Sequence, residues 1–172
     1  LAMLRENLRR SAGNGRGFGM TADLDQIDRA ILSTLQKDSR LSMAELGEKV
    51  GLSSSACHRR VLQLQTAGVI EGYAARLNAK SLGLDLHFIV DVSLHSQAEE
   101  DLETFERAAG NNTSVLECYL MAGQADFSLR VSARDTAHYE EVHRQIAHMP
   151  GVTRIESKLI LRTVKKWMGY KV

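Results

Sequence analysis

The sequence predicts an α+β protein with two parts: an N-terminal group of three short helices, and a C-terminal part in the order β-α-β-β-α-β. Three observations support this fold class. Apolar residues recur at helical spacing between residues 24 and 68, strand and helix patterns alternate between residues 86 and 166, and the charge changes sign between the halves. Residues 1–80 carry 12 Lys and Arg against 8 Asp and Glu, whereas residues 81–172 carry 10 against 13. A basic front and an acidic back indicate two functions.

Length and composition favour an ordinary globular chain. The 172 residues are 44% apolar, enough to bury a core in one domain or in two small ones. No run approaches the roughly 18 apolar residues of a membrane span, and no secretory signal opens the chain, so we expect a cytoplasmic protein without a membrane partner. Cys57 and Cys118 lie far apart without a CxxC partner, which favours two small buried side chains over a disulfide or a zinc site.

Residues 1–20 do not resemble a folded segment. They begin without Met and continue into a stretch rich in Gly, Arg and Ser that no core would need. We expect a disordered tail or an upstream extension, with Met20 as a plausible natural start.

The first two helices are marked by local signals. Leu24, Ile27, Ile31 and Leu35 form an apolar stripe behind acidic residues that suit a first turn. The sequence SMAE at 42–45 has the form of a capping box, and Gly51 supplies a left-handed stop.

The third helix carries the polar residues of interest. Ser53 is a suitable N-cap, and the helix is predicted to run to about Ala67 and to end at Gly68. A tight turn between the second and third helices has the spacing of a helix-turn-helix. If Cys57, Val61 and Leu64 pack inward, the opposite face is left for solvent or for the major groove of DNA. That face comprises Ser54, Ser55, His58, Arg59 and Gln63.

The rest of the chain alternates between strands and helices. Residues 69–78 are predicted to form a strand, followed by a linker at 78–85. Strands are then expected at 86–95, 115–123, 125–133 and 152–166, and helices at 97–110 and 136–149. This is the split βαβ, or ferredoxin-like, order.

The ordered combination of these segments resembles the Lrp/AsnC family of regulators, from the helix-turn-helix run through the GQADF hairpin to MPGV at 149–152. The resemblance covers about residues 23–168. It implies a winged helix-turn-helix at 21–70, a linking strand and linker at 71–85, and a ligand-sensing and oligomerisation domain at 86–172. It also implies homodimers that assemble into higher oligomers such as an octamer. One departure is Ser54, where many members have a proline.

The resemblance also implies where the sites lie. The DNA-reading helix corresponds to Ser53–Leu64, which gives the DNA-binding set Ser53, Ser54, Ser55, His58, Arg59, Arg60 and Gln63. A small effector, usually an amino acid, is expected at a subunit interface near the hairpin, with Gly123, Asp126 and Ser157 as its binding residues. A carboxylate suits the α-ammonium, and Gly-turn amides with a hydroxyl suit the α-carboxylate. No catalytic residue, metal ligand or other cofactor is expected.

Several of these residues have a structural alternative. Arg60 lies beside the inward stripe, so it could stabilise the fold or contact a phosphate instead of reading a base. Asp126 could cap the turn at Gly123, a role that is compatible with ligand contact. The histidines His138, His143 and His148 recur every five residues, whereas zinc-binding pairs on a helix prefer a spacing of four, so surface positions are favoured.

The leading hypothesis is therefore a sequence-specific DNA-binding transcription regulator whose assembly responds to a small effector, and not an enzyme. One alternative is an enzyme on the same scaffold, as in the siroheme decarboxylases, which a coloured tetrapyrrole in the purified protein would reveal. A second alternative is a ligand-binding assembly module without DNA affinity. In that case, loss of Arg59 and Arg60 together would leave function untouched.

Overall fold

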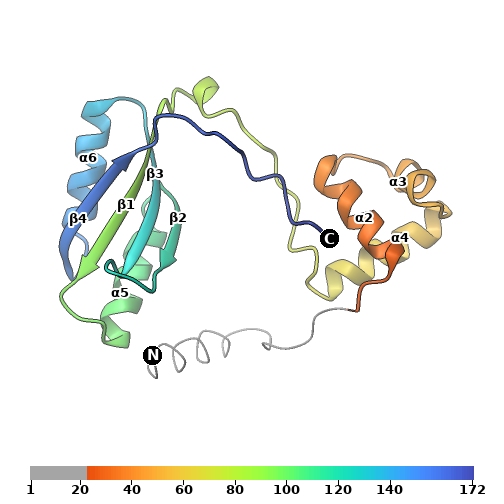
Figure 1. Ribbon diagram of the computed structural model, residues 1–172, viewed down its shortest axis with the longest axis horizontal. Coiled ribbons are helices and arrows are strands. Elements are labelled where there is room, and N and C mark those ends of the chain that lie inside the picture. The colour runs from red at the N-terminus through yellow and green to blue at the C-terminus, as the bar shows by residue number, and fades with distance from the viewer. Residues whose placement is uncertain (1–22) are drawn as a thin grey trace. The chain divides into compact units, whose positions relative to one another are not determined.

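The computed structural model describes residues 23–172, so the expectation for residues 1–20 lies outside the described part. The chain divides into two compact units (Figure 1). The described part of the first unit consists of residues 23–76 and 165–172, and the second is Leu77–Val164. Among the described residues, no helix is long and apolar enough to cross a membrane.

The first unit contains the three predicted helices, α2 (Gln26–Lys37), α3 (Met43–Val50) and α4 (Ser54–Thr66). Each begins at a side-chain cap. Asp25 and Asp28 form a capping box on α2, Ser42 and Glu45 form the expected one on α3, and Ser53 caps α4. The apolar stripes meet in one core, whose fully or nearly buried members are Ile31, Leu32, Leu35, Leu46, Cys57, Val61 and Leu64.

The turn between α3 and α4 is closed by two glycines. Gly51 has a φ of 73°, the left-handed conformation predicted for it. Gly47 lies beneath the turn, where its carbonyl accepts a hydrogen bond from Leu52 N at 2.8 Å. A Cβ atom on Gly47 would lie 2.6 Å from the carbonyl oxygen of Leu52. The close approach of α3 to the turn therefore requires a residue without a side chain.

The strand expected at 69–78 is not formed. Val69 and Ile70 pack against the helical core, and residues 71–78 follow without regular structure, so the described chain has no wing strand after α4. A short 3-10 helix (Lys80–Leu82) then precedes the sheet. The strand prediction was wrong because an apolar pattern indicates burial, whereas a strand also needs a hydrogen-bonding partner, and this segment pairs with no strand among residues 23–172.

The end of the chain belongs to the first unit. The side-chain amide of Gln36 makes two hydrogen bonds with the backbone of Tyr170: Nε2 donates to the carbonyl at 2.9 Å, and Oε1 accepts from the amide at 2.6 Å. Arg76 donates to the carbonyl of Trp167 at 3.0 Å. The chain end is thus fixed to α2 and to the segment that follows α4.

The second unit has the predicted β-α-β-β-α-β order. It comprises β1 (Leu86–Leu94), α5 (Glu99–Gly110), β2 (Val115–Leu120), β3 (Phe127–Ala133), α6 (Thr136–Ala147) and β4 (Val152–Leu159). The strands form an antiparallel sheet in the order β2-β3-β1-β4. The last strand ends at Leu159 and not at the expected residue 166, because β1, its only neighbour in the sheet, begins at Leu86 and gives the chain after Ile160 no partner.

The sheet has one covered and one open face. Alternate residues of β1 and β3 pack with the apolar sides of α5 and α6, as in the contact of Phe105 with Phe127, whose ring centroids are 4.5 Å apart. Cys57 is buried as expected, but Cys118 is exposed, because it lies on the edge strand β2. The open face carries polar side chains of β1 and β4, including the directly paired Asp91 and Glu156.

Candidate functional site

The outward face of α4 is polar and accessible. Ser53, Ser54, Ser55, His58, Arg59 and Gln63 are all exposed, whereas Cys57, Val61 and Leu64 are buried as predicted. The Ser53 hydroxyl accepts a hydrogen bond from Ala56 N at 3.3 Å, which satisfies a donor of the first turn. The side chains of His58, Arg59 and Gln63 make no hydrogen bond or ion pair with other residues between 23 and 172. This face is therefore available to a partner outside the described chain.

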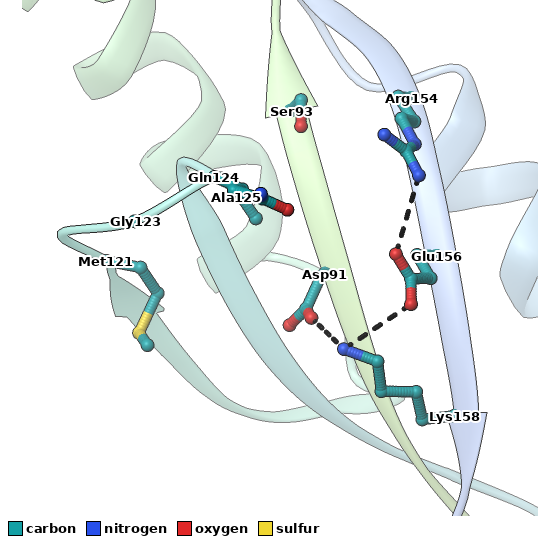
Figure 2. A pocket seen from close by; sticks show the side chains of 9 residues that line it. All are labelled: Asp91, Ser93, Met121, Gly123, Gln124, Ala125, Arg154, Glu156 and Lys158. Atoms are coloured by element: carbon teal, nitrogen blue, oxygen red, sulfur yellow. Dashed lines mark hydrogen bonds and ion pairs between the residues drawn. The ribbon is translucent and has the colours of Figure 1, made fainter.

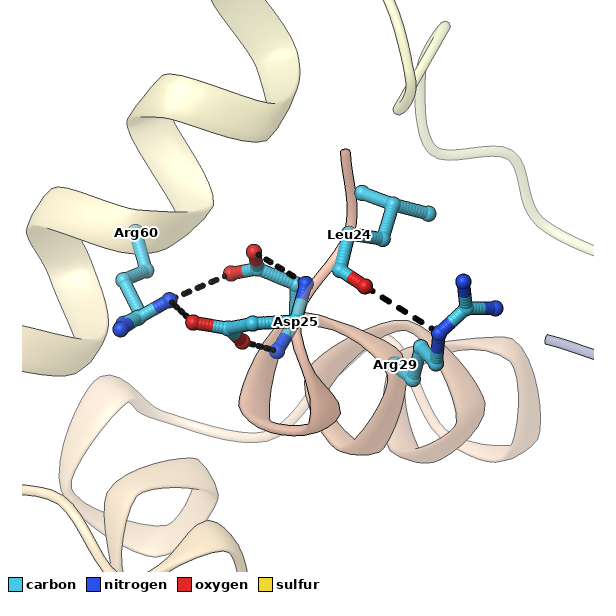
Figure 3. Close-up of polar contacts among 5 residues, drawn as sticks. Leu24, Asp25, Arg29 and Arg60 are labelled. Atoms are coloured by element: carbon cyan, nitrogen blue, oxygen red, sulfur yellow. Dashed lines mark hydrogen bonds and ion pairs between the residues drawn. The ribbon is translucent and has the colours of Figure 1, made fainter. Parts of the chain in front are cut away.

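Arg60 differs from its neighbour Arg59. Its Nη1 atom donates to Asp25 Oδ2 at 2.7 Å and to Asp28 Oδ1 at 2.9 Å, and its side chain is only 27% exposed (Figure 3). The two acidic residues are those of the α2 capping box. Arg60 thus joins α4 to the first turn of α2, which is the bracing alternative considered above.

These contacts alter the acidity of the groups involved. The pKa of Asp25 is lowered, first by the hydrogen bond from the backbone amide of Asp28 and then by the hydrogen bond from Arg60. The two carboxylates raise the pKa of Arg60. The ion pair of Asp25 with Arg60 consequently stays charged at neutral pH.

A cavity of about 280 Å³ opens on the polar face of the sheet in the second unit. Figure 2 shows Asp91 and Ser93 on β1, three residues of β4, and the loop between β2 and β3 at its rim. Its size is close to the lower end of the roughly 300–1,000 Å³ usual for ligand pockets. The lining residues are Asp91, Ser93, Met121, Gly123, Gln124, Ala125, Arg154, Glu156 and Lys158.

The charges in the cavity are balanced and linked. Lys158 Nζ lies 2.5 Å from Asp91 Oδ2 and 3.6 Å from Glu156 Oε1, and Arg154 lies 3.6 Å from Glu156 (Figure 2). The hydrogen bond from Lys158, followed by that from Ser128, lowers the pKa of Asp91. Two cations thus alternate with two anions, an arrangement that offers partners for both ends of a zwitterion.

Asp126 lies beside the cavity without lining it. Its side chain turns inward, with Oδ2 accepting from Leu94 N and Oδ1 from Gln97 Nε2, both at 2.7 Å, and the residue is 8% exposed. The carboxylate therefore does not cap the turn at Gly123, the alternative considered for it in the sequence; its donors come from β1 and the following loop.

The three expected effector residues do not converge within one chain. Gly123 lies at the cavity rim, but Ser157 pairs directly with Val90, a buried residue of the helix-covered face. Directly paired residues share a face of the sheet, so Ser157 and the cavity are on opposite sides. The charged residues of β4 were missed in the sequence. Their alternation with Ile155 was the signal that could have placed Arg154, Glu156 and Lys158 on one face.

No metal centre accompanies these sites in the described chain. Residues 23–172 contain no group of three or more His, Cys, Asp or Glu side chains placed to hold an ion. His138 and His148 bond to local backbone, with Nδ1 of His138 accepting from Arg134 N at 3.1 Å and Nδ1 of His148 lying 2.7 Å from Arg144 O.

Comparison with known proteins assigns both units. The AsnC-type helix-turn-helix domain matches residues 24–65, and the Lrp/AsnC ligand binding domain matches residues 87–169. The chain belongs to the Lrp/AsnC family of transcriptional regulators. It is therefore a transcription regulator with a helix-turn-helix and a ligand-binding domain, and its family relatives are regulators and not enzymes.

Individual Lrp/AsnC relatives are similar over most of their length. The leucine-responsive regulatory protein of Escherichia coli K12 is 36% identical over 145 residues, which cover 84% of this chain and 88% of that protein. A transcriptional regulator from Neisseria meningitidis, solved as its complex with L-methionine, is 33% identical with a TM-score of 0.79 over 83% of this chain and 93% of that one. An AsnC family regulator from Agrobacterium tumefaciens is 31% identical with a TM-score of 0.79, over 83% and 94% of the two chains.

Proposed function

We propose that the exposed face of α4 reads an operator in the major groove of double-stranded DNA. The observation that supports this proposal is the contrast between Arg59, exposed and without a partner among residues 23–172, and Arg60, paired with two carboxylates. Ser53, Ser54, Ser55 and Arg59 suit phosphate oxygens near the start of the helix. His58 and Gln63 suit base edges. Arg60 supports this face by holding α4 against α2.

The test begins with operator fragments selected from genomic DNA by the full-length protein. Binding of the parent and Arg59→Ala proteins to one such fragment is measured by fluorescence anisotropy over a range of salt concentrations. Loss of one phosphate contact should weaken binding to all sequences and reduce the magnitude of the logarithmic salt slope by about 1. The matched control is Arg107→Ala, which removes the same charge from the surface of α5 and should leave the slope unchanged. Equal slopes for all three proteins would contradict the contact.

We also propose that the second unit binds an amino acid in the cavity beside Gly123. The support is the balanced charge of the cavity, with Arg154 available to the α-carboxylate and Asp91 or Glu156 to the α-ammonium, together with the L-methionine complex of the Neisseria meningitidis regulator. A net anion or a net cation would meet repulsion from half of these groups. No cofactor is needed for this role.

Calorimetric titration of the full-length protein with L-methionine and L-leucine tests the pocket. Arg154→Gln should weaken binding of the amino acid by about tenfold or more, the usual cost of losing a charged hydrogen bond, while the corresponding amino alcohol, which lacks the carboxylate, loses little. Arg134→Gln, on the loop after β3 and outside the cavity lining, is the matched control. Equal losses for the acid and the alcohol would contradict carboxylate recognition by Arg154.

We further propose that the protein acts as a homodimer that assembles into larger oligomers. Exposed apolar side chains recur in the segments that pair with no strand among residues 23–172, among them Tyr73, Leu77, Leu161 and Val164. Apolar surface that is contiguous and exposed often marks a contact with another protein. Light scattering coupled to size exclusion measures the assembly. A monomer at micromolar concentration would contradict this proposal.

A further inference from the structure

Every polar group of Asp126, in the backbone and in the side chain, makes a hydrogen bond. Its amide donates to Val92 O at 3.0 Å, its carbonyl accepts from Met121 N at 2.8 Å, and its two carboxylate oxygens accept from Leu94 N and Gln97 Nε2. These partners come from three segments: the end of β1, the loop before α5, and the hairpin between β2 and β3. The residue is 8% exposed, so no lone carboxylate oxygen faces the cavity.

Few polar contacts other than those of Asp126 join the hairpin at 121–126 to the other described residues. Within the described chain, residues 122–125 make no backbone–backbone hydrogen bond, and residues 121–124 are exposed. Four residues of the hairpin, Met121, Gly123, Gln124 and Ala125, line the cavity. Among residues 23–172, the polar contacts that join this rim to the rest of the sheet lie at its two ends, and Asp126 supplies those to β1 and Gln97.

We propose that Asp126 is a positioning residue for the effector: it holds the cavity rim against β1 and Gln97, and it does not pair with the ligand's ammonium group. This inference rests on the proposed function, in which an amino acid binds beside Gly123. Gln97 does not line the cavity, but it takes part in this positioning because its side-chain amide donates a hydrogen bond to one carboxylate oxygen of Asp126.

The two roles of Asp126 respond differently to Asp126→Asn. An asparagine keeps the acceptor for Leu94 N, and its amide can donate to Gln97 once the Gln97 amide turns over, so both bonds survive while the charge is lost. A positioning residue tolerates this change, whereas a carboxylate that pairs with an ammonium does not. Asp126→Ala removes both bonds, and Gln97→Ala removes one without touching the cavity.

The experiment measures L-methionine and L-leucine affinity by calorimetry in the full-length variants. We expect the affinity of Asp126→Asn for the amino acids to stay within about threefold of that of the parent. The affinities of Asp126→Ala and Gln97→Ala should fall about tenfold or more. Gln145→Ala, which removes a surface side-chain hydrogen bond to Asn112, is the matched control and should have no effect. The proposal would be overturned if Asp126→Asn bound the amino acids as weakly as Asp126→Ala while Gln97→Ala bound them with the affinity of the parent. If Asp126→Ala does not fold, the comparison of Asp126→Asn with Gln97→Ala still decides it.

Amide hydrogen exchange of the ligand-free proteins separates this inference from the proposed function. The amides of Leu94 and Met121 should remain protected in Asp126→Asn and should exchange about tenfold faster in Gln97→Ala. Unchanged exchange in Gln97→Ala would refute the anchor even if both amino acids bind. If the parent binds neither amino acid, the effector proposal fails, while the exchange rates still support or overturn the positioning role.

Discussion

Arg59 and Arg60 are adjacent in the chain, but only Arg60 has an ion-pair partner among residues 23–172. Because Arg60 is paired with Asp25 and Asp28, we expect Arg60→Met to weaken operator binding a few-fold by loosening α4, with an unchanged salt slope. Arg59→Ala should instead change the slope, as argued above. Anisotropy titrations at several salt concentrations measure both. A slope for Arg60→Met that falls as it does for Arg59→Ala would mean that Arg60 reaches a phosphate.

The pairing at Asp25 also predicts a pH dependence. Its pKa is lowered from the ordinary value of 3.8 in the folded protein, so its contribution to stability is complete above that value and is lost as the pH falls through the lower folded pKa. Asp25→Asn keeps an N-cap but removes the charge. The parent should be more stable than Asp25→Asn at pH 6, and this difference should disappear in strong acid. Urea unfolding midpoints at several pH values measure it; a constant difference would contradict the assignment.

The helix-turn-helix element depends on the contact at Gly47. Gly47→Ala would gain helix propensity but would place a Cβ atom 2.6 Å from the carbonyl oxygen of Leu52, and a backbone atom cannot rotate away. We expect a net loss of about 1–3 kcal/mol in the free energy of unfolding. Gly110→Ala, on α5 with open space around it, is the control and should be neutral or stabilising by up to about 1 kcal/mol. Equal stability of the two variants would show that the turn can widen.

The C-terminal segment is an element held by very few bonds. Gln36→Ala removes both hydrogen bonds to Tyr170, so trypsin should cut after Lys165 and Lys166 a few-fold faster. Gln65→Ala, an exposed change on α4, serves as the comparison. Identical cleavage rates in the parent and in Gln36→Ala would mean that the segment is fixed by other contacts.

At the scale of the whole molecule, the proposed dimer would present two α4 helices to the DNA and so constrain the spacing of its operator. Half-sites should lie about 34–36 Å apart, one helical turn of DNA. Inserting about half a turn between them should weaken binding by tenfold or more, and inserting a full turn should restore part of it. Anisotropy with three operators of different spacing tests this. Indifference to spacing would favour independent binding by single helix-turn-helix units.

The elements that could be predicted were those whose signals are local. The caps at Ser42 and Ser53 lie within three residues of the amides that they satisfy, so their helices were located almost to the residue. The segments at 69–78 and 161–166 have apolar patterns similar to those of real strands, yet they pair with no strand among residues 23–172 and do not form strands. An apolar pattern in the sequence indicates burial, whereas a strand also needs hydrogen bonds from a segment that is distant in sequence.

The amino-acid sequence by itself determined the fold class, the helix-turn-helix, the outward face of α4 and, through resemblance, the family. The helix-turn-helix and the outward face of α4 follow from periodicity and caps within single helices, and the fold class and the family follow from the order of such segments along the chain. Only the tertiary structure decided that Arg60 pairs with Asp25 and Asp28, that Asp126 bonds to Leu94 and Gln97, and that Asp91 meets Lys158. Each of those contacts joins residues about 30 or more positions apart, and their meeting depends on strand register and helix packing, which no local pattern encodes.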